Sequence, residues 1–450
     1  MPQLTRKLTL RGAAAIQGFP NVKLLSRLVN GVPARIALKG SADVAGKAVT
    51  LVVTAVAART LNADAFGVLA LAMATGWLLG VATDAGLSMH LARDTARRPG
   101  QQRQLLIEVL RLRAGLAYVA ATMIAFFTPE IVPPHWKMQF VLVVFAQLTG
   151  AIIETVAHYY RGIERSEIES AIHASHRLST LVLALVVLTW WPRLDLLGAA
   201  MLIPAVLAML VSFAVAWRIT GNREPGTGSR ESLLTPSTFA RDVFPLGAAV
   251  LVSALYFRID VFFIERWQGL EAVGGYNAVF RLVEAMRLLP AAVMAVTFPM
   301  LVQTTDTRLV QRIGGVLAIA GVVLALICAL GSSLIVPLIY GAPYLYTAPT
   351  FAILSLALPL FFLNYALTHQ VIAWDGQRAY LLIATLALVA NVAANVALVP
   401  SQGMIGAAIA TLLTEVVVTA GCIYVLFTTV QRDGSARRFS AKVQHEGSAR

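Results

Sequence analysis

Long apolar segments are the feature that most restricts how this chain can fold. A hydrocarbon layer about 30 Å thick requires a helix of about 20 residues, because each residue adds about 1.5 Å. Since backbone groups find no water there, only helices and closed barrels can span it. We therefore predict an all-α polytopic membrane protein with twelve transmembrane helices, at residues 41–58, 66–91, 105–127, 138–160, 171–191, 196–217, 239–265, 275–300, 313–336, 350–373, 379–399 and 403–428.

The composition excludes the main classes of soluble protein. Of 450 residues, 58% are hydrophobic and only 13% are charged, about half of the usual charged share of roughly 25%. Disorder requires low hydrophobicity, and a disulfide scaffold requires many cysteines, whereas Cys328 and Cys422 both lie in apolar segments. A net charge of +13 could indicate nucleic acid on a soluble surface. In a membrane chain it indicates orientation instead, and we expect no nucleic-acid partner.

Basic residues divide unequally between the two sets of loops. Lys and Arg accumulate in short cytoplasmic loops. The set with few of them holds Arg59, Lys137, Arg193 and Arg266. The opposite set, which we assign to the cytoplasm together with both termini, holds Arg93, Arg97, Arg98, Arg103, Arg161, Arg165, Arg218, Arg223, Arg230, Arg308, Arg312 and Arg378.

Charge and Gly/Pro content divide the chain into five predicted regions. These are a basic cytoplasmic extension at 1–40, a six-helix bundle at 41–217, a cytoplasmic linker at 218–238, a second six-helix bundle at 239–428 and a basic cytoplasmic tail at 429–450. The extension has no acidic residue and no continuous apolar core of a signal peptide, so we expect it to be retained.

An internal repeat relates the two predicted bundles. Pro192 followed by Gly198-Ala199-Ala200 recurs as Pro400 followed by Gly406-Ala407-Ala408, at an offset of 208 residues, and Gly67 matches Gly274 at an offset of 207. Six helices per repeat is an even number, so the repeats are parallel and related by an axis along the membrane normal. We expect a substrate path between the two halves.

Several short motifs occur in order along residues 41–428: Phe66-Gly67-Val68-Leu69, Asp84-Ala85-Gly86-Leu87, Tyr256-Phe257-Arg258-Ile259-Asp260, Gly274-Gly275-Tyr276-Asn277, Phe298-Pro299, and Val399-Pro400 with Gly403-x-x-Gly406-Ala407-Ala408. Together they resemble the polysaccharide-export branch, the Wzx-type lipid-linked oligosaccharide flippases, of the multidrug/oligosaccharidyl-lipid/polysaccharide (MOP) exporter superfamily. The resemblance implies a MATE-like two-bundle transporter in the cytoplasmic membrane of a bacterium. Such a protein flips a polyprenyl-pyrophosphate-linked oligosaccharide by alternating access, among membrane lipids and beside the polymerase and glycosyltransferases of its pathway.

Ionisable residues inside predicted spans are the candidate site residues, because such groups usually face a cavity or a partner. Arg281, Glu284 and Arg287 follow one stripe of a helix at spacings of three, and Arg258 and Asp260 precede them on an antiparallel neighbour. Three arginines exceed two carboxylates, and Arg matches phosphate oxygens bidentately. We therefore predict that Arg258, Arg281 and Arg287 bind the pyrophosphate, with Asp260 and Glu284 balancing charge or binding a coupling ion. The alternative is two structural ion pairs, Arg281 with Glu284 and Arg258 with Asp260.

Asp43 and Lys47 have the i, i+4 spacing of a helical ion pair. Lys47 could contact phosphate on the cytoplasmic side, with Asp43 balancing its charge, or it could extend to the membrane surface. Asp84, Glu154, His158 and Glu415 are further polar residues in spans, which we expect to be satisfied within the bundles. Glu169, His173 and His176 lack a second ligand set, so we predict no metal site.

The sequence contains no Walker loop, dinucleotide-binding glycine motif, HExxH motif or nucleophile elbow. We therefore expect neither an enzyme nor a cofactor, and transport driven by H⁺, Na⁺ or the membrane potential. Three other functions remain open: a cation-coupled multidrug exporter of the same superfamily, a peptidoglycan-precursor flippase, and a membrane glycan polymerase or ligase. The second resembles chains with fourteen helices, and the third would require a large outward catalytic loop.

Overall fold

The computed structural model describes residues 46, 48–221, 235, 237, 239–303, 307–374 and 376–447, and these residues form helices without any strand. Asp43, Lys47, the predicted extension at 1–40 and most of the linker lie outside the described residues. Within the described ranges, nine helices are long and apolar enough to cross a membrane, or ten if one bent pair counts as a span. The predicted all-α polytopic membrane fold is confirmed, whereas the count of twelve is not.

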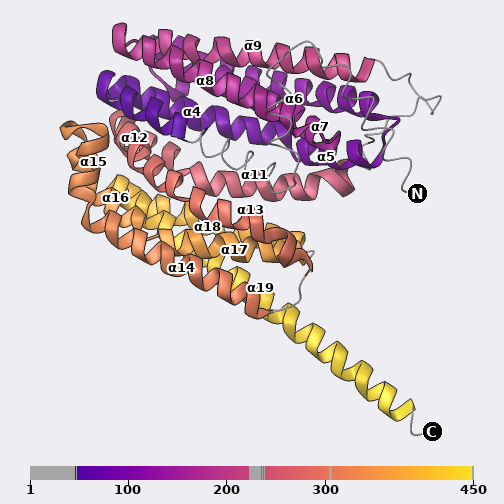
Figure 1. The fold of residues 1–450 in the computed structure, drawn as a ribbon. Coiled ribbons are helices and arrows are strands. Elements are labelled where there is room, and N and C mark those ends of the chain that lie inside the picture. The colour runs from indigo at the N-terminus through magenta and orange to yellow at the C-terminus, as the bar shows by residue number, and fades with distance from the viewer. Residues whose placement is uncertain are drawn as a thin grey trace, which may run out of the picture. The chain divides into compact units, whose positions relative to one another are not determined.

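The first half begins with a short apolar helix at Ala48–Thr60. Six helices follow: α4 (Ala63–Asp84), α5 (Leu87–Arg97), α6 (Gln102–Ile131), α7 (Lys137–Gly162), α8 (Ser166–Trp190) and α9 (Leu194–Gly221), with the 3₁₀ turn η2 (Pro134–Trp136) before α7 (Figure 1). α7 is central, because it packs against α4, α5 and α9. α8 lies on α9.

The second half starts with a π-helical turn, η3 (Phe239–Val243). Its helices are α11 (Phe244–Arg258), α12 (Asp260–Met286), α13 (Leu288–Gln303), α14 (Thr307–Leu330), α15 (Ser332–Tyr340), α16 (Ala348–Ser355), α17 (Leu358–Ala373), α18 (Gln377–Gln402) and α19 (Met404–Gly447), with the 3₁₀ segment η4 (Ala342–Thr347) before α16 (Figure 1). α18 packs on α19 and α11, and α17 packs on α14. The segment Ala342–Ser355 meets α17 at a bend of 42°, which is the bent pair counted above.

Residues with positive φ interrupt one predicted span and separate two others. The span predicted at 66–91 ends at Asp84, because Ala85 (φ 44°) and Gly86 (φ 87°) are left-handed and α5 starts afresh at Leu87. The seventh and eighth spans form one apolar stretch, Gly247–Met294, which is broken inside α12 by Gly269 at φ 81° and ψ −178°. Gly269 lies in the loop predicted between the two spans.

The two halves meet along α4. Gly67 lies so close to α12 that an added Cβ would be 2.0 Å from the Leu270 carbonyl oxygen, and Gly274 faces Gly67 in turn. At the other end of α4, a Cβ on Gly247 of α11 would lie 2.1 Å from the Ala85 carbonyl oxygen. Gly67 and Gly274 are the pair related by the sequence repeat. These two glycines are therefore in close contact where the two halves meet.

Large apolar side chains cover the outer faces of the helices. On α6, α8, α9 and α14 they are mostly exposed, and among the exposed ones are Tyr118, Phe126, Leu178, Leu207, Ile319 and Leu330. A soluble protein would bury most such side chains and would rarely expose large contiguous patches of them. Their distribution is that of a multi-pass membrane protein whose helices face lipid.

Candidate functional site

A cavity of about 380 Å³ lies between the two halves. The first half lines it with residues of the helix at 48–60, α4, α7, α8 and α9, and the second half with residues of α11 and α12. Its apolar lining includes Val53, Met73 and Trp77. Its ionisable lining residues form two groups, which are Glu154, His173, His176 and Arg177 from the first half and Arg258, Arg281 and Glu284 from the second.

Glu284 holds both cavity arginines of the second half. Its Oε2 accepts hydrogen bonds from Arg258 at 2.8 Å and from Arg281 at 2.7 Å. Arg258 ends α11, while Arg281 and Glu284 lie one turn apart on α12, after the Gly269 break has brought α12 back alongside α11. Among these three residues one positive charge is in excess.

Asp260 is not the ion-pair partner of Arg258 that the structural alternative required. Its carboxylate accepts a hydrogen bond from the Tyr276 hydroxyl and one of 2.9 Å from the Val261 backbone N–H. Asp260 is buried and does not line the cavity. It stabilises the start of α12, because carboxylates are favoured at helix N-termini.

Arg287 lies apart from the other two predicted arginines. Its guanidinium faces the rings of Phe257 at 4.3 Å, Phe361 at 4.6 Å and Tyr365 at 5.8 Å, which is cation–π geometry. It does not line the cavity. The helical stripe predicted from the spacing therefore divides: Arg281 and Glu284 face the cavity, and Arg287 faces aromatic rings of the second half.

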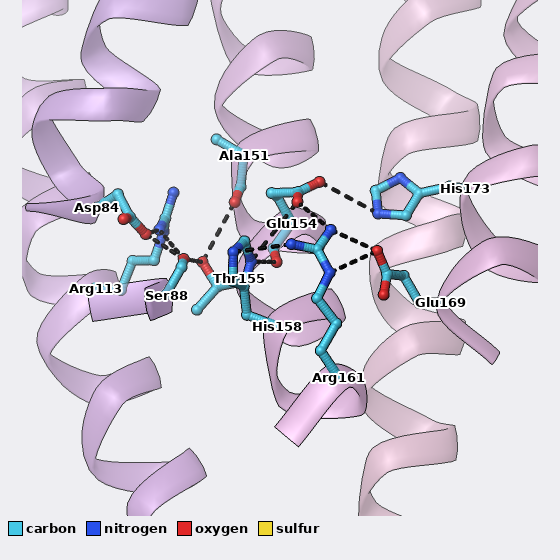
Figure 2. Close-up of polar contacts among 10 residues, drawn as sticks. All are labelled: Asp84, Ser88, Arg113, Ala151, Glu154, Thr155, His158, Arg161, Glu169 and His173. Atoms are coloured by element: carbon cyan, nitrogen blue, oxygen red, sulfur yellow. Dashed lines mark hydrogen bonds and ion pairs between the residues drawn. The ribbon is translucent and has the colours of Figure 1, made fainter. Parts of the chain in front are cut away.

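Figure 2 shows the polar network of the first half, which centres on α7. Arg161 donates to Glu154 at 2.9 Å and through Nε to Glu169 at 2.8 Å. His173 of α8 places Nε2 at 3.3 Å from the second Glu154 carboxylate oxygen. A separate group of contacts links Thr155 through Ser88 to Asp84, where Arg113 of α6 donates to the carboxylate (Figure 2).

The predicted satisfied polar residues have partners. Asp84 pairs with Arg113, and Glu154 and His158 share contacts with Arg161. Glu415 accepts a hydrogen bond of 2.7 Å from the Asn364 side chain, away from this network. Glu154 nevertheless differs from the others, because it also lines the cavity.

The cavity face of α8 is a functional feature that was not predicted from the sequence. His173, His176, Arg177 and Thr180 follow spacings of i, i+3, i+4 and i+7, and all four line the cavity. This spacing places residues on one helical face, so it could have identified the face in advance. Among the described residues no group of three or more candidate metal ligands occurs.

Comparison with known proteins identifies the family. A family model described as polysaccharide biosynthesis protein matches residues 35–305, which is more than half of the chain. No curated protein sequence matches.

Solved structures share the fold at low sequence identity. An inward-facing multidrug resistance MATE family transporter of the MOP superfamily has a TM-score of 0.69 at 13% identity, covering 86% of this chain and 96% of its own. The lipid II flippase MurJ, in an inward closed conformation, has a TM-score of 0.65 at 12% identity, covering 86% of each chain. A point mutant of the Vibrio cholerae MATE transporter VcmN has a TM-score of 0.59 at 15% identity, covering 89% of this chain and 95% of its own. The chain therefore belongs to the polysaccharide biosynthesis protein family and has the fold of the MOP-superfamily transporters.

Proposed function

We propose that this transporter flips a polyprenyl-pyrophosphate-linked oligosaccharide from the cytoplasmic to the outer leaflet of a bacterial cytoplasmic membrane, by alternating access and with both termini in the cytoplasm. The glycosyltransferases of the pathway supply this substrate, and a polymerase consumes it after transfer. The single observation that carries the proposal is the arginine pair in the cavity between the two halves. Arg258 and Arg281 share one carboxylate, so their combined charge is not cancelled.

The geometry of Arg281 suits a phosphate ligand. Its NH1 is used by Glu284, while its Nε–H, also buried, donates no hydrogen bond within the described part of the chain. A buried donor without a partner costs about 1–3 kcal/mol, and a phosphate oxygen in the cavity would recover that energy. The guanidinium fork allows two parallel bonds to one phosphate group. A lipid diphosphate therefore fits this wall of the cavity.

The membrane potential would favour transport in the proposed direction. A pyrophosphate that carries about two negative charges gains roughly 2.3 kcal/mol per charge per 100 mV when it moves out of a cell that is negative inside. Asp260 and Glu284 were predicted to balance charge or to bind H⁺ or Na⁺. Glu284 serves the first role in the proposal, because it orients both arginines.

A multidrug exporter is the main competing function, since MATE transporters share the fold. A cation-selective cavity requires excess negative charge, whereas the second-half wall has excess positive charge. The charge of this wall favours an anionic ligand over a cationic drug.

The test is binding to the full-length protein in detergent. The probe is farnesyl diphosphate capped as its methyl ester, which has one charge on each phosphate, and ethidium is the cationic comparison. Arg281→Gln removes one charge-assisted hydrogen bond worth about 1.5–3 kcal/mol, so affinity for the probe should fall by about 10- to 150-fold. Arg193→Gln is the control, because Arg193 is mostly exposed and pairs with Asp195 away from the cavity. Binding of ethidium but not of the diphosphate, or an unchanged Arg281→Gln variant, would refute the proposal.

A further inference from the structure

One aromatic side chain is exposed in the cavity and has no role in the proposed diphosphate contact. Trp77 of α4 lines the cavity and is 40% exposed. Every other residue of α4 from 65 to 84 is buried or half-buried, because α4 packs against α7, α11 and α12. Leu69, Met73 and Trp77 line the cavity at spacings of four residues, which places them on one helical face. The exposed ring of Trp77 therefore belongs to the cavity.

Trp77 lies close to the arginine pair. Its ring contacts Phe257 edge to face, with the centroids 6.3 Å apart and the planes at 62°. The guanidinium carbon of Arg258 lies 5.4 Å from the centroid of the same Phe257 ring. One ring thus contacts both Trp77 and Arg258. A group joined directly to a phosphate on this arginine would therefore reach Trp77.

Uncharged polar side chains surround the exposed indole. A Cβ on Gly76 would lie 2.6 Å from the Gln147 Cβ, so Gln147 of α7 meets α4 at the residue that precedes Trp77. Gln147 also lines the cavity, and its amide provides one acceptor oxygen and two donor hydrogens. Thr180 of α8 lines the cavity too, and its hydroxyl is buried without a hydrogen-bond partner in the described ranges. Such an unsatisfied hydroxyl favours a polar ligand.

Gly150 leaves open space beside the Gln147 amide. It follows Gln147 by three residues on α7 and lines the cavity, so the two positions share one helical face. A Cβ added at Gly150 would meet no atom within 4 Å. A ligand group can therefore occupy the space between Gln147 and the cavity interior, and a larger side chain at this position would fill it.

An aromatic face beside an amide and a hydroxyl matches the chemistry of a pyranose sugar. A pyranose presents C–H groups on one face, which pack on an indole ring, and hydroxyl groups at its edge, which exchange hydrogen bonds with amides and hydroxyls. A cationic ligand could also contact the ring, but Arg258 and Arg281 share one carboxylate and leave excess positive charge nearby. An acyl chain would leave the Thr180 hydroxyl unsatisfied.

We propose that Trp77, Gln147 and the space at Gly150 form a subsite for the first sugar of the substrate. The sugar packs its C–H face on Trp77, and its hydroxyls bond to Gln147 and Thr180. This sugar is joined to the diphosphate through a single oxygen, so it lies at Trp77 when the arginine pair holds the phosphates. The inference rests on the proposed function, since the diphosphate contact places the sugar.

Two probes of equal charge measure what the sugar contributes to binding by the full-length protein in detergent. One is the methyl-capped farnesyl diphosphate, and the other has glucose in place of the methyl group. The ratio of the two affinities is the sugar gain, which removes any general effect on the diphosphate contact. For the wild type we expect a gain of about tenfold, from one aromatic contact and one or two hydrogen bonds.

The variants separate the ring from the space beside it. Trp77→Leu should have almost no sugar gain, while Trp77→Phe keeps an aromatic face and should retain part of it. Gly150→Leu should lose the gain because its side chain occupies the subsite. Trp190→Leu is the matched control, because Trp190 is 65% exposed at the end of α8 and does not line the cavity. Gel filtration checks that each variant is folded.

The outcomes distinguish this inference from the proposed function. Binding of the capped diphosphate by the wild type without a sugar gain would overturn the subsite and leave the proposed function intact. A full gain in Trp77→Leu or in Gly150→Leu would also overturn the subsite. So would loss of ethidium binding but not of the sugar gain in Trp77→Leu, which would make Trp77 a contact for cations. Binding of neither probe by the wild type would overturn the proposed function and the subsite with it.

Discussion

Replacing Glu284 with Gln should destabilise the protein and tighten its binding of an anion. The carboxylate accepts from Arg258 at 2.8 Å and Arg281 at 2.7 Å, and these side chains are 5% and 14% exposed. Breaking a buried ion pair by removing one partner costs about 3–5 kcal/mol. The Glu284 side chain is 24% exposed, so water recovers part of this energy, and we expect a loss of about 3 kcal/mol.

The free energy of unfolding can be measured by titration with dodecyl sulfate, followed by tryptophan fluorescence. Glu167→Gln is the matched control, since its exposed pair with Arg165 should contribute at most about 1 kcal/mol. The capped farnesyl diphosphate should then stabilise Glu284→Gln more than it stabilises the wild type, because two arginines no longer share a carboxylate. Equal stability of Glu284→Gln and wild type, or weaker stabilisation of the variant by the probe, would refute the reasoning about this cluster.

Three further variants test other contacts. Gly67→Ala places a Cβ about 2.0 Å from a carbonyl oxygen of α12. The resulting overpacking should cost about 1–3 kcal/mol of stability and shift spin-label distances between α4 and α12. Gly115→Ala, whose added Cβ meets nothing within 4 Å, should leave these distances unchanged. Arg113→Met should lower the free energy of unfolding by about 3–5 kcal/mol, because it leaves Asp84 unpaired. Adding Asp84→Asn should restore most of that free energy. A double variant as unstable as Arg113→Met would contradict the Asp84–Arg113 pairing. Tyr276→Phe should cost about 1–3 kcal/mol, because it removes a donor to the buried carboxylate at the start of α12, and a change below about 0.5 kcal/mol would show that this bond is unimportant.

Agreement between sequence and structure is best where a single helix suffices for the prediction. The spans predicted at 105–127, 138–160, 171–191 and 196–217 correspond to α6, α7, α8 and α9. Apolar length alone defines such helices, because the thickness of the hydrocarbon layer sets it. The left-handed residues Ala85 and Gly86 were not anticipated, since the close approach of Gly247 from α11 depends on which helices become neighbours.

The candidate site also combines features that the sequence predicts with features that depend on which helices become neighbours. The sequence identified Arg258, Arg281 and Glu284 as charges inside spans, and the alternative of structural ion pairs placed Arg258 with Asp260, which is nearby in the sequence. In the structure the turn at Gly269 brings Glu284 close enough to accept a hydrogen bond from Arg258. Asp260 instead accepts a hydrogen bond from the Tyr276 hydroxyl. Lys47 and Asp43 remain predictions.

The sequence by itself determined that this protein is a helical membrane protein with charge inside its spans, because hydrophobic length and the presence of an arginine are properties of single segments. The tertiary structure decided which charges share a cavity: Arg281 faces it and Arg287 does not, although they lie six residues apart on one predicted stripe. It also placed the histidine face of α8 in the same cavity as the arginine pair. Which charged groups pair depends on which helix faces meet. The faces that meet depend in turn on helix breaks and on close contacts at glycines from distant parts of the chain.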